Sequence, residues 1–196
     1  MAQKSKSMKK IITIISILIA SIAANNAVNS HQLNNETTVT YEELFNDFSA
    51  LYGEKQAEAA EAAVEAKADD LLAFADRFLG TKYLLGANGP NRFDCSGFTS
   101  YVFRHFGYNL ARRASHQINN GEKVSKNNVR PGDLVFFNGR AINGRIGHVG
   151  IIYDVKDNGT FTFIHASIHG VRHNNSTDDY YARRYMGACR ILSSES

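Results

Sequence analysis

The sequence predicts an α+β fold in which a mostly antiparallel β-sheet packs against helices. Before Gly80, apolar residues recur at helical spacing, whereas after it glycines and turn residues increase and short apolar runs replace the helices. Several of those runs are apolar on both faces, so we expect helices to cover much of the sheet. With 196 residues and a hydrophobic fraction of 43%, the chain has room for one well-formed domain plus an appendage.

The N-terminus has the features of a secretory signal peptide. Four lysines precede an uncharged apolar run over residues 11–20, and Ser21-Ile22-Ala23 supplies small residues for cleavage. The run is too short to cross a membrane as a helix. We therefore expect residues 1–23 to be removed, and the mature protein to be secreted or held in the periplasm or cell envelope without stable membrane insertion. A retained anchor is the alternative.

Residues 24–67 are predicted to form a tether followed by a helical arm. Residues 24–38 are rich in Asn, Ser and Thr, and a capping pattern at residues 40–43 begins a helix that is expected to end at Gly53. A second helix is expected over residues 54–79. Its first half is rich in Ala and Glu, which favours helix but leaves little to bury, and its second half is apolar enough to join the core.

Charge is distributed unevenly along the chain. Residues 31–79 carry a net charge of −8 and residues 80–196 carry +7, while the whole chain is +3 because of the lysines in the predicted signal. Two interpretations are open: two solvated surfaces of opposite bias, or an acidic arm that docks on a basic body, over its cleft. No basic helix and no interleaved aromatic–basic motif is present, so we expect no nucleic-acid partner.

Four apolar runs after residue 130 predict the strands of the sheet. One turn between them, Asn158-Gly159, is a strong hairpin signal. A hairpin centred near residue 157 would place His148 and His165 roughly opposite each other, on the same face of neighbouring strands. The predicted strands span residues 134–137, 148–153, 161–166 and 185–192.

A cysteine lies at the predicted start of another helix. Apolar spacing over residues 98–105, with Gly107 as the stop, places Cys95 in the first helical turn and Asp94 at the N-cap. The unpaired N–H groups and the positive end of the helix dipole favour a thiolate, can lower its pKa below neutral, and can hold an oxyanion. The ordinary alternative is a buried cysteine that acts as a small hydrophobic residue.

These residues together have the pattern of thiol catalysis: Cys95 as nucleophile, His148 as general base, and His165 as the group that orients the base. The same three side chains could instead bind zinc, but no Cys-x-x-Cys or His-x-x-x-His spacing supports a metal site, so no metal or other cofactor is expected. His116 is a rival base in a turn-like stretch. Cys189, within an apolar strand, is interpreted as packing.

From about Gly80 to Leu192 the chain resembles the NlpC family of bacterial cell-wall cysteine peptidases, within the papain-like superfamily. One departure is Tyr83-Leu84-Leu85-Gly86-Ala87, where the family usually has a Trp and paired glycines after the tyrosine. The matching segments, in chain order, are Gly80-Thr81-Lys82-Tyr83, Phe93-Asp94-Cys95-Ser96-Gly97-Phe98, Arg113-Ala114-Ser115-His116-Gln117, Arg130-Pro131-Gly132-Asp133-Leu134-Val135-Phe136-Phe137, Gly147-His148-Val149-Gly150-Ile151 and Phe163-Ile164-His165-Ala166.

The resemblance implies a papain-like fold for residues 68–196 and hydrolysis of peptide bonds in peptidoglycan stem peptides, typically the γ-D-glutamyl bond to a diamino acid. We expect the protein to be a monomer. An amidase or transpeptidase of the same superfamily and a silent wall-binding module are the alternatives. The implied roles are nucleophile for Cys95, base for His148, third polar residue for His165, a position near the thiol and oxyanion for Tyr83, and the substrate side of the cleft for Asp94 and Ser96.

Overall fold

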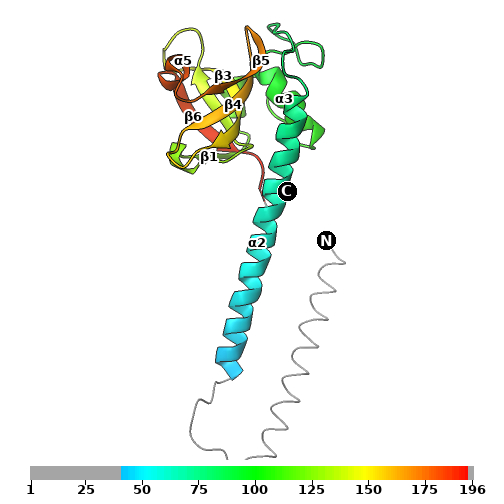
Figure 1. The fold of residues 1–196 in the computed structure, drawn as a ribbon, viewed down its shortest axis with the longest axis vertical. Coiled ribbons are helices and arrows are strands. Elements are labelled where there is room, and N and C mark those ends of the chain that lie inside the picture. Colours follow the sequence, from blue (N-terminus) through cyan, green and yellow to red (C-terminus); the bar gives the residue numbers. More distant parts are fainter. Residues whose placement is uncertain (1–40, 194–196) are drawn as a thin grey trace, which may run out of the picture. The chain divides into compact units, whose positions relative to one another are not determined.

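The computed structural model describes residues 41–193 (Figure 1), so the predicted signal peptide and the predicted tether over residues 24–38 lie outside the described residues. The chain divides into two compact units, residues 1–51 and 52–196. The predicted α+β fold is confirmed. In chain order the elements are α2 (Tyr41–Asp76), α3 (Cys95–His105), α4 (Ala114–Gln117), β1 (Glu122–Val124), the 3-10 turn η1 (Lys126–Asn128), β2 (Leu134–Asn138), β3 (Ile146–Val155), β4 (Phe161–Ser167), β5 (Gly170–Asn175), α5 (Asp179–Ala182) and β6 (Tyr185–Arg190).

The predicted helix break at Gly53 is wrong, because α2 runs through it as one helix of 36 residues. A glycine inside a helix costs only about 1 kcal/mol relative to alanine, and the Ala-, Glu- and Gln-rich residues that follow it favour helix strongly. The helix also ends at Asp76 rather than at Leu79. The chain then turns, and Gly80 takes a left-handed backbone conformation with φ of 79°, which suits a glycine.

The C-terminal part of α2 packs on the body of the second unit. Ala68, Leu71, Leu72 and Ala75 are buried and recur at the spacing of one helical face. Asp76 fastens the end of this helix, since its carboxylate accepts hydrogen bonds from the hydroxyl of Tyr153 on β3 (2.6 Å) and pairs with His173 on β5 (2.9 Å). Nearer the N-terminus of α2, Glu61 forms an exposed ion pair with Arg130.

The sheet has six strands in the order β1-β6-β2-β3-β4-β5, and every neighbouring pair is antiparallel. The four predicted strands occupy its centre, and the two that sequence analysis missed, β1 and β5, form its edges. Edge strands are half solvated and are kept short or polar, so their sequences lack the apolar pattern of a central strand. Glu-Lys-Val in β1 and Gly-Val-Arg-His-Asn-Asn in β5 are of this kind.

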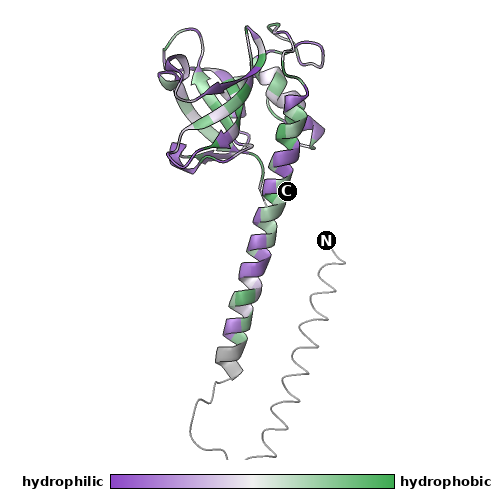
Figure 2. Ribbon diagram, viewed as in Figure 1, coloured by the Kyte–Doolittle hydropathy of each residue, from purple (hydrophilic) through white to green (hydrophobic). Residues whose placement is uncertain are grey.

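Apolar side chains pack on both faces of the sheet, as its central strands predict. All five residues of β2 are buried: Leu134 and Phe136 join the cluster beneath α2 and α3, whereas Val135 and Phe137 join a second cluster on the opposite face. Hydrophobic residues run along these strands in Figure 2. Helix α3 packs against β3 and β4, and this packing brings the start of α3 to the strands that carry the histidines.

Replacing Phe98 with alanine is expected to lower the free energy of unfolding by about 3–5 kcal/mol. Phe98 is fully buried in α3, with its ring edge-to-face against Phe93 at 5.4 Å, so truncation leaves a cavity in the hydrophobic core. Urea unfolding followed by circular dichroism measures the loss. Leu85→Ala is the control, because that side chain is 81% exposed and its loss should change stability little; equal losses in both variants would contradict this packing.

Candidate active site

Helix α3 begins at Cys95, with Asp94 as its N-cap. The Asp94 backbone is extended, and its Oδ1 accepts a hydrogen bond from the N–H of Gly97 at 2.7 Å, which satisfies one free donor of the first turn. The carbonyl of Ala87 lies against this turn, so close that a Cβ at position 97 would be 2.1 Å from it. The loop before the helix therefore packs tightly on the turn that carries the thiol, and only glycine fits there.

Asp94 also accepts hydrogen bonds from the half-exposed Arg112, a residue that sequence analysis missed when it named the neighbouring Arg113. Arg112 donates to both carboxylate oxygens of Asp94, at 3.0 and 2.5 Å, and to Oγ of Ser96 at 3.0 Å. Burial raises the pKa of Asp94, but the hydrogen bonds from Arg112 and from the N–H groups of Gly97 and Gly86 outweigh it and hold the pKa below its ordinary value. Asp94 and Ser96 are therefore held inside the protein, each 5% exposed.

The expected lowering of the Cys95 pKa is wrong in direction. Burial raises the pKa of this thiol, since the residue is only 8% exposed, and the negative charge of Asp94 raises it further. Backbone N–H groups of Val149, Ser96 and Cys95 itself oppose the shift without reversing it. The sequence indicated the helix terminus, but it indicated neither how deeply the Cys95 thiol is buried nor the effect of the charge on the capping Asp94.

The Cys95 sulfur lies at the start of β3, because the N–H of Val149, the residue after His148, is among the groups that act on it. Tyr83 is also near: burial raises the pKa of its hydroxyl, and the charges of Cys95 and Asp94 add to the increase. No hydrogen bond within residues 41–193 joins the sulfur to His148. Such contacts are often long before substrate binds and tighten in the substrate complex.

The imidazoles of His148 and His165 are in direct contact, as the hairpin predicts. Nε2 of His148 lies 2.7 Å from Nδ1 of His165, with the two rings nearly perpendicular. The register differs from the predicted one: extending the pair Ile151–Ile164 by one residue puts Gly150, not His148, opposite His165. A Cβ at position 150 would be 3.1 Å from Cβ of His165, so the glycine leaves the space across which the two rings meet.

Three polar residues beyond His165, namely Asn174, Asp178 and Tyr181, extend this contact, and sequence analysis singled out none of them. Nε2 of His165 lies 3.0 Å from Oδ1 of Asn174 on β5, and Nδ2 of Asn174 donates to Oδ2 of Asp178 at 2.7 Å. The hydroxyl of Tyr181 lies 3.4 Å from the same His165 nitrogen. The only sequence signal is that Asn174 lies two residues after Arg172, a spacing that puts both side chains on the same face of a strand.

Both histidines of the pair are held neutral. Burial, then the neighbouring His165, lowers the pKa of His148 to about 3, and burial lowers the pKa of His165 to about 4 despite a hydrogen bond with Asn174 that raises it. The imidazoles are therefore uncharged at neutral pH, and His148 keeps a basic lone pair.

The free energy of unfolding should consequently fall as the pH drops from about 6.5 to about 4. In this window the unfolded chain protonates both histidines near pH 6.5 while the folded protein does not, so the unfolded state binds more protons and stability rises with pH. Urea unfolding at a series of pH values measures the slope. The double variant His148→Gln/His165→Gln should flatten it, and an unchanged slope in that variant would show that other groups are responsible.

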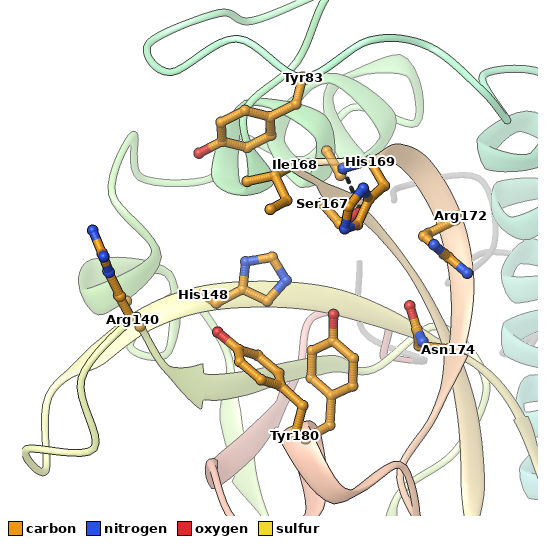
Figure 3. A pocket seen from close by; sticks show the side chains of 13 residues that line it. Tyr83, Arg140, His148, Ser167, Ile168, His169, Arg172, Asn174 and Tyr180 are labelled. Atoms are coloured by element: carbon orange, nitrogen blue, oxygen red, sulfur yellow. Dashed lines mark hydrogen bonds between the residues drawn. The ribbon is translucent and has the colours of Figure 1, made fainter.

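A cavity of about 680 Å³ lies beside His148 (Figure 3). Tyr83 projects from one side and Tyr180 from the other, with the His148 ring between them. Cys95 is not among the lining residues, so the thiol reaches the surface only through its small exposed area. Lining residues are Tyr83, Gly139, Arg140, Gly147, His148, Ala166, Ser167, Ile168, His169, Arg172, Asn174, Tyr180 and Tyr181.

Two further residues that the sequence analysis named, Gln117 and Cys189, are buried and have structural roles. Gln117 is fully buried and donates to the backbone oxygens of Ser96 and Ala111, which ties α4 to α3. Cys189 is fully buried in β6, as its apolar context predicts.

Among the described residues, no three His, Cys, Asp or Glu side chains are grouped as metal ligands. Across residues 41–193, no helix combines the length and apolar character needed to cross a membrane.

Comparison with known proteins finds consistent similarities. A probable endopeptidase p60 of Listeria grayi is 38% identical over 141 residues, covering 69% of this chain and 22% of that protein. A murein DD-endopeptidase MepS/murein LD-carboxypeptidase of Escherichia coli K12 is 40% identical over 116 residues, covering 58% of this chain and 57% of that protein. The chain thus spans about a fifth of the p60 protein and just over half of the E. coli one.

Among solved structures, an NlpC/P60 family protein from Bacillus cereus superposes with a TM-score of 0.57 at 31% identity, covering 64% of this chain and 40% of that protein. Residues 80–190, more than half of the chain, match the sequence profile of the NlpC/P60 family. This segment contains the helix that begins at Cys95, both histidines of the pair, and the whole of the sheet. The chain therefore belongs to the NlpC/P60 family.

Proposed function

We propose that residues 68–196 form a cysteine peptidase domain that hydrolyses peptide bonds in peptidoglycan stem peptides. The contact between His148 and His165 carries this proposal, since it leaves Nδ1 of His148 as the free basic nitrogen beside the strand residue that touches the thiol. Both imidazoles are engaged with each other at 2.7 Å, an arrangement that favours proton transfer over shared coordination of a metal. The murein-directed names of the relatives point to the same substrate class.

The chemistry begins with a neutral thiol and a neutral base. As the sulfur of Cys95 attacks the scissile carbonyl carbon, His148 takes the thiol proton, and the N–H groups at the start of α3 stabilise the oxyanion. Collapse of the tetrahedral intermediate breaks the C–N bond, and His148 returns the proton to the leaving amine. Water, deprotonated by His148, then hydrolyses the thioester and regenerates the thiol.

We further propose that this proton transfer occurs with attack, not before it, because burial raises the pKa of Cys95 and lowers that of His148, and because no hydrogen bond in the described residues joins the sulfur to His148. A resting thiolate–imidazolium pair would need the opposite shifts. Tyr83, beside the thiol and lining the cavity, is proposed to contact the substrate carbonyl region. Asp94 and Ser96 are proposed to act through Arg112, because their hydrogen bonds hold its side chain, which is 43% exposed, in a fixed position from which we propose that it contacts the substrate.

The bond proposed is the γ-D-glutamyl bond to the diamino acid of the stem peptide, and the site of action is outside the cell, after removal of residues 1–23. Incubation of the purified chain with defined muropeptides, followed by mass spectrometry of the products, tests both the reaction and the bond. Release of a fragment that begins with the diamino acid supports the proposal. Cleavage of the sugar–peptide amide would indicate an amidase, exchange of peptides a transpeptidase, and intact muropeptides would refute hydrolysis.

A further inference from the structure

The hydrogen bonds around His165 have a direction that a single carboxylate determines. An ionised carboxylate can only accept hydrogen bonds. Asp178 is ionised at neutral pH, because the ordinary pKa of an aspartate is about 3.9 and the surroundings lower the pKa of Asp178 further. The group of Asn174 that faces Asp178, 2.7 Å away, must therefore be the amide NH₂, and its carbonyl oxygen must face His165.

This orientation fixes the protons on both rings. Oδ1 of Asn174 can only accept a hydrogen bond, and it lies 3.0 Å from Nε2 of His165. His165 must therefore carry its proton on Nε2, which leaves its Nδ1 as an acceptor. His148 must then donate its own Nε2 proton to that nitrogen across 2.7 Å. The remaining nitrogen of His148, Nδ1, therefore has a free lone pair, which is the form that a general base requires.

We propose that Asn174 and Asp178 are positioning residues that set the tautomers of His165 and His148. Each of the three contacts has one direction, and all three follow from the acceptor at position 178. Without that acceptor, the Asn174 amide is free to turn its NH₂ toward His165. The proton of His165 would then move to Nδ1, and His148 would hold its proton on Nδ1, where it cannot accept one from the thiol.

The surrounding residues support a positioning role. Oδ2 of Asp178 also accepts from the backbone N–H of Asn175 at 3.1 Å, so the carboxylate is held on the turn between β5 and α5. The Tyr181 hydroxyl, 3.4 Å from Nε2 of His165, offers a second acceptor to the same proton. Asp179, the next residue along, has no side-chain hydrogen bond or ion pair within the described part of the chain, so it is a matched carboxylate for comparison.

Asp178→Ala is expected to lower kcat about tenfold to a hundredfold with little change in KM, because bound substrate is unaffected while the base is in the wrong form. ¹⁵N NMR of the imidazoles should show both rings as Nε2–H in the wild type, and a population of Nδ1–H in this variant. Asp179→Ala should change neither measurement. Asp178→Asn should keep most of the activity, since its Oδ1 can accept the same two hydrogen bonds.

The exchange variant Asn174→Asp/Asp178→Asn is the sharpest comparison. The carboxylate introduced at position 174 would accept from both His165 and the amide introduced at position 178, so the tautomers and kcat should stay close to those of the wild type. Asn174→Leu, in contrast, should lose activity like Asp178→Ala. If Asp178→Ala fails to fold, the exchange variant and Asn174→Leu still test the proposed positioning role. Unchanged kcat in Asn174→Leu, or reduced kcat with both rings still Nε2–H, would overturn the proposal.

Discussion

Cys95→Ala is expected to lower the release of stem-peptide fragments from purified peptidoglycan on the order of 10⁴-fold or more, because no other group can form the covalent intermediate. The fold should persist, since alanine keeps the Cβ and removes one sulfur from a site that is already 8% exposed. Cys95→Ser should be nearly as inactive. A serine hydroxyl is a far poorer nucleophile without full deprotonation, and nothing near position 95 lowers a pKa enough to supply it.

Cys189→Ala is the matched control, because it removes the other cysteine of the chain while leaving the proposed nucleophile in place. Cys189 is fully buried, and burial raises the pKa of its thiol to about 12. Iodoacetamide should therefore label Cys95 in the folded protein before it labels Cys189. Circular dichroism should give the same spectrum for the wild type and both Cys95 variants. Substantial turnover by Cys95→Ala would exclude the covalent mechanism.

The central strands and the helix that carries Cys95 could be predicted from sequence because their signals are local. Strand β2 is apolar at every position but its last, and α3 has apolar residues at helical spacing with a capping aspartate before them. Gly53 misled the prediction for a physical reason: glycine is permitted both at the end of a helix and, at modest cost, inside one. Only the residues that flank it decide, and here they favour a continuous helix.

The edge strands were harder to predict, and the consequence reaches the candidate site. Strand β5 is polar because one side faces solvent, so the sequence analysis did not predict it as a strand and did not single out Asn174. Its carbonyl nevertheless contacts His165, and Asp178 follows it in the next turn. The sequence indicates that two histidines share a face, since that follows from a period of two. It does not indicate which residue of a third strand lies behind them, because that depends on the pairing register.

Electrostatics could be predicted least well. The helix dipole at Cys95 follows from sequence, but the burial of the thiol and the nearby Asp94 carboxylate, which together outweigh the dipole, follow only from packing. Arg112 shows the same limit, because two adjacent arginines are indistinguishable in sequence and only one turns toward Asp94. Burial and the Asp94 carboxylate raise the pKa of Cys95, which favours a neutral thiol in place of the thiolate that the sequence analysis expected.

That neutral thiol makes His148→Ala the second large effect. We expect kcat to fall about 10³- to 10⁴-fold, because attack would require a thiolate formed without its base. His148→Gln should fall as far, although its amide can still donate to Nδ1 of His165 and fill much of the space of the ring. His116→Ala is the control: this exposed histidine on α4 is the rival base from sequence, and its loss should leave kcat unchanged.

The pH dependence of the residual activity separates a lost base from a damaged site. With His148 neutral down to about pH 4, the wild-type rate should vary little between pH 5 and 7. In His148→Ala the reactive species is the free thiolate, and the raised pKa of Cys95 keeps that species scarce. Its rate should therefore rise about tenfold for each pH unit across the neutral range. A flat profile in the variant would mean that another group still accepts the thiol proton, and His148 would not be the base.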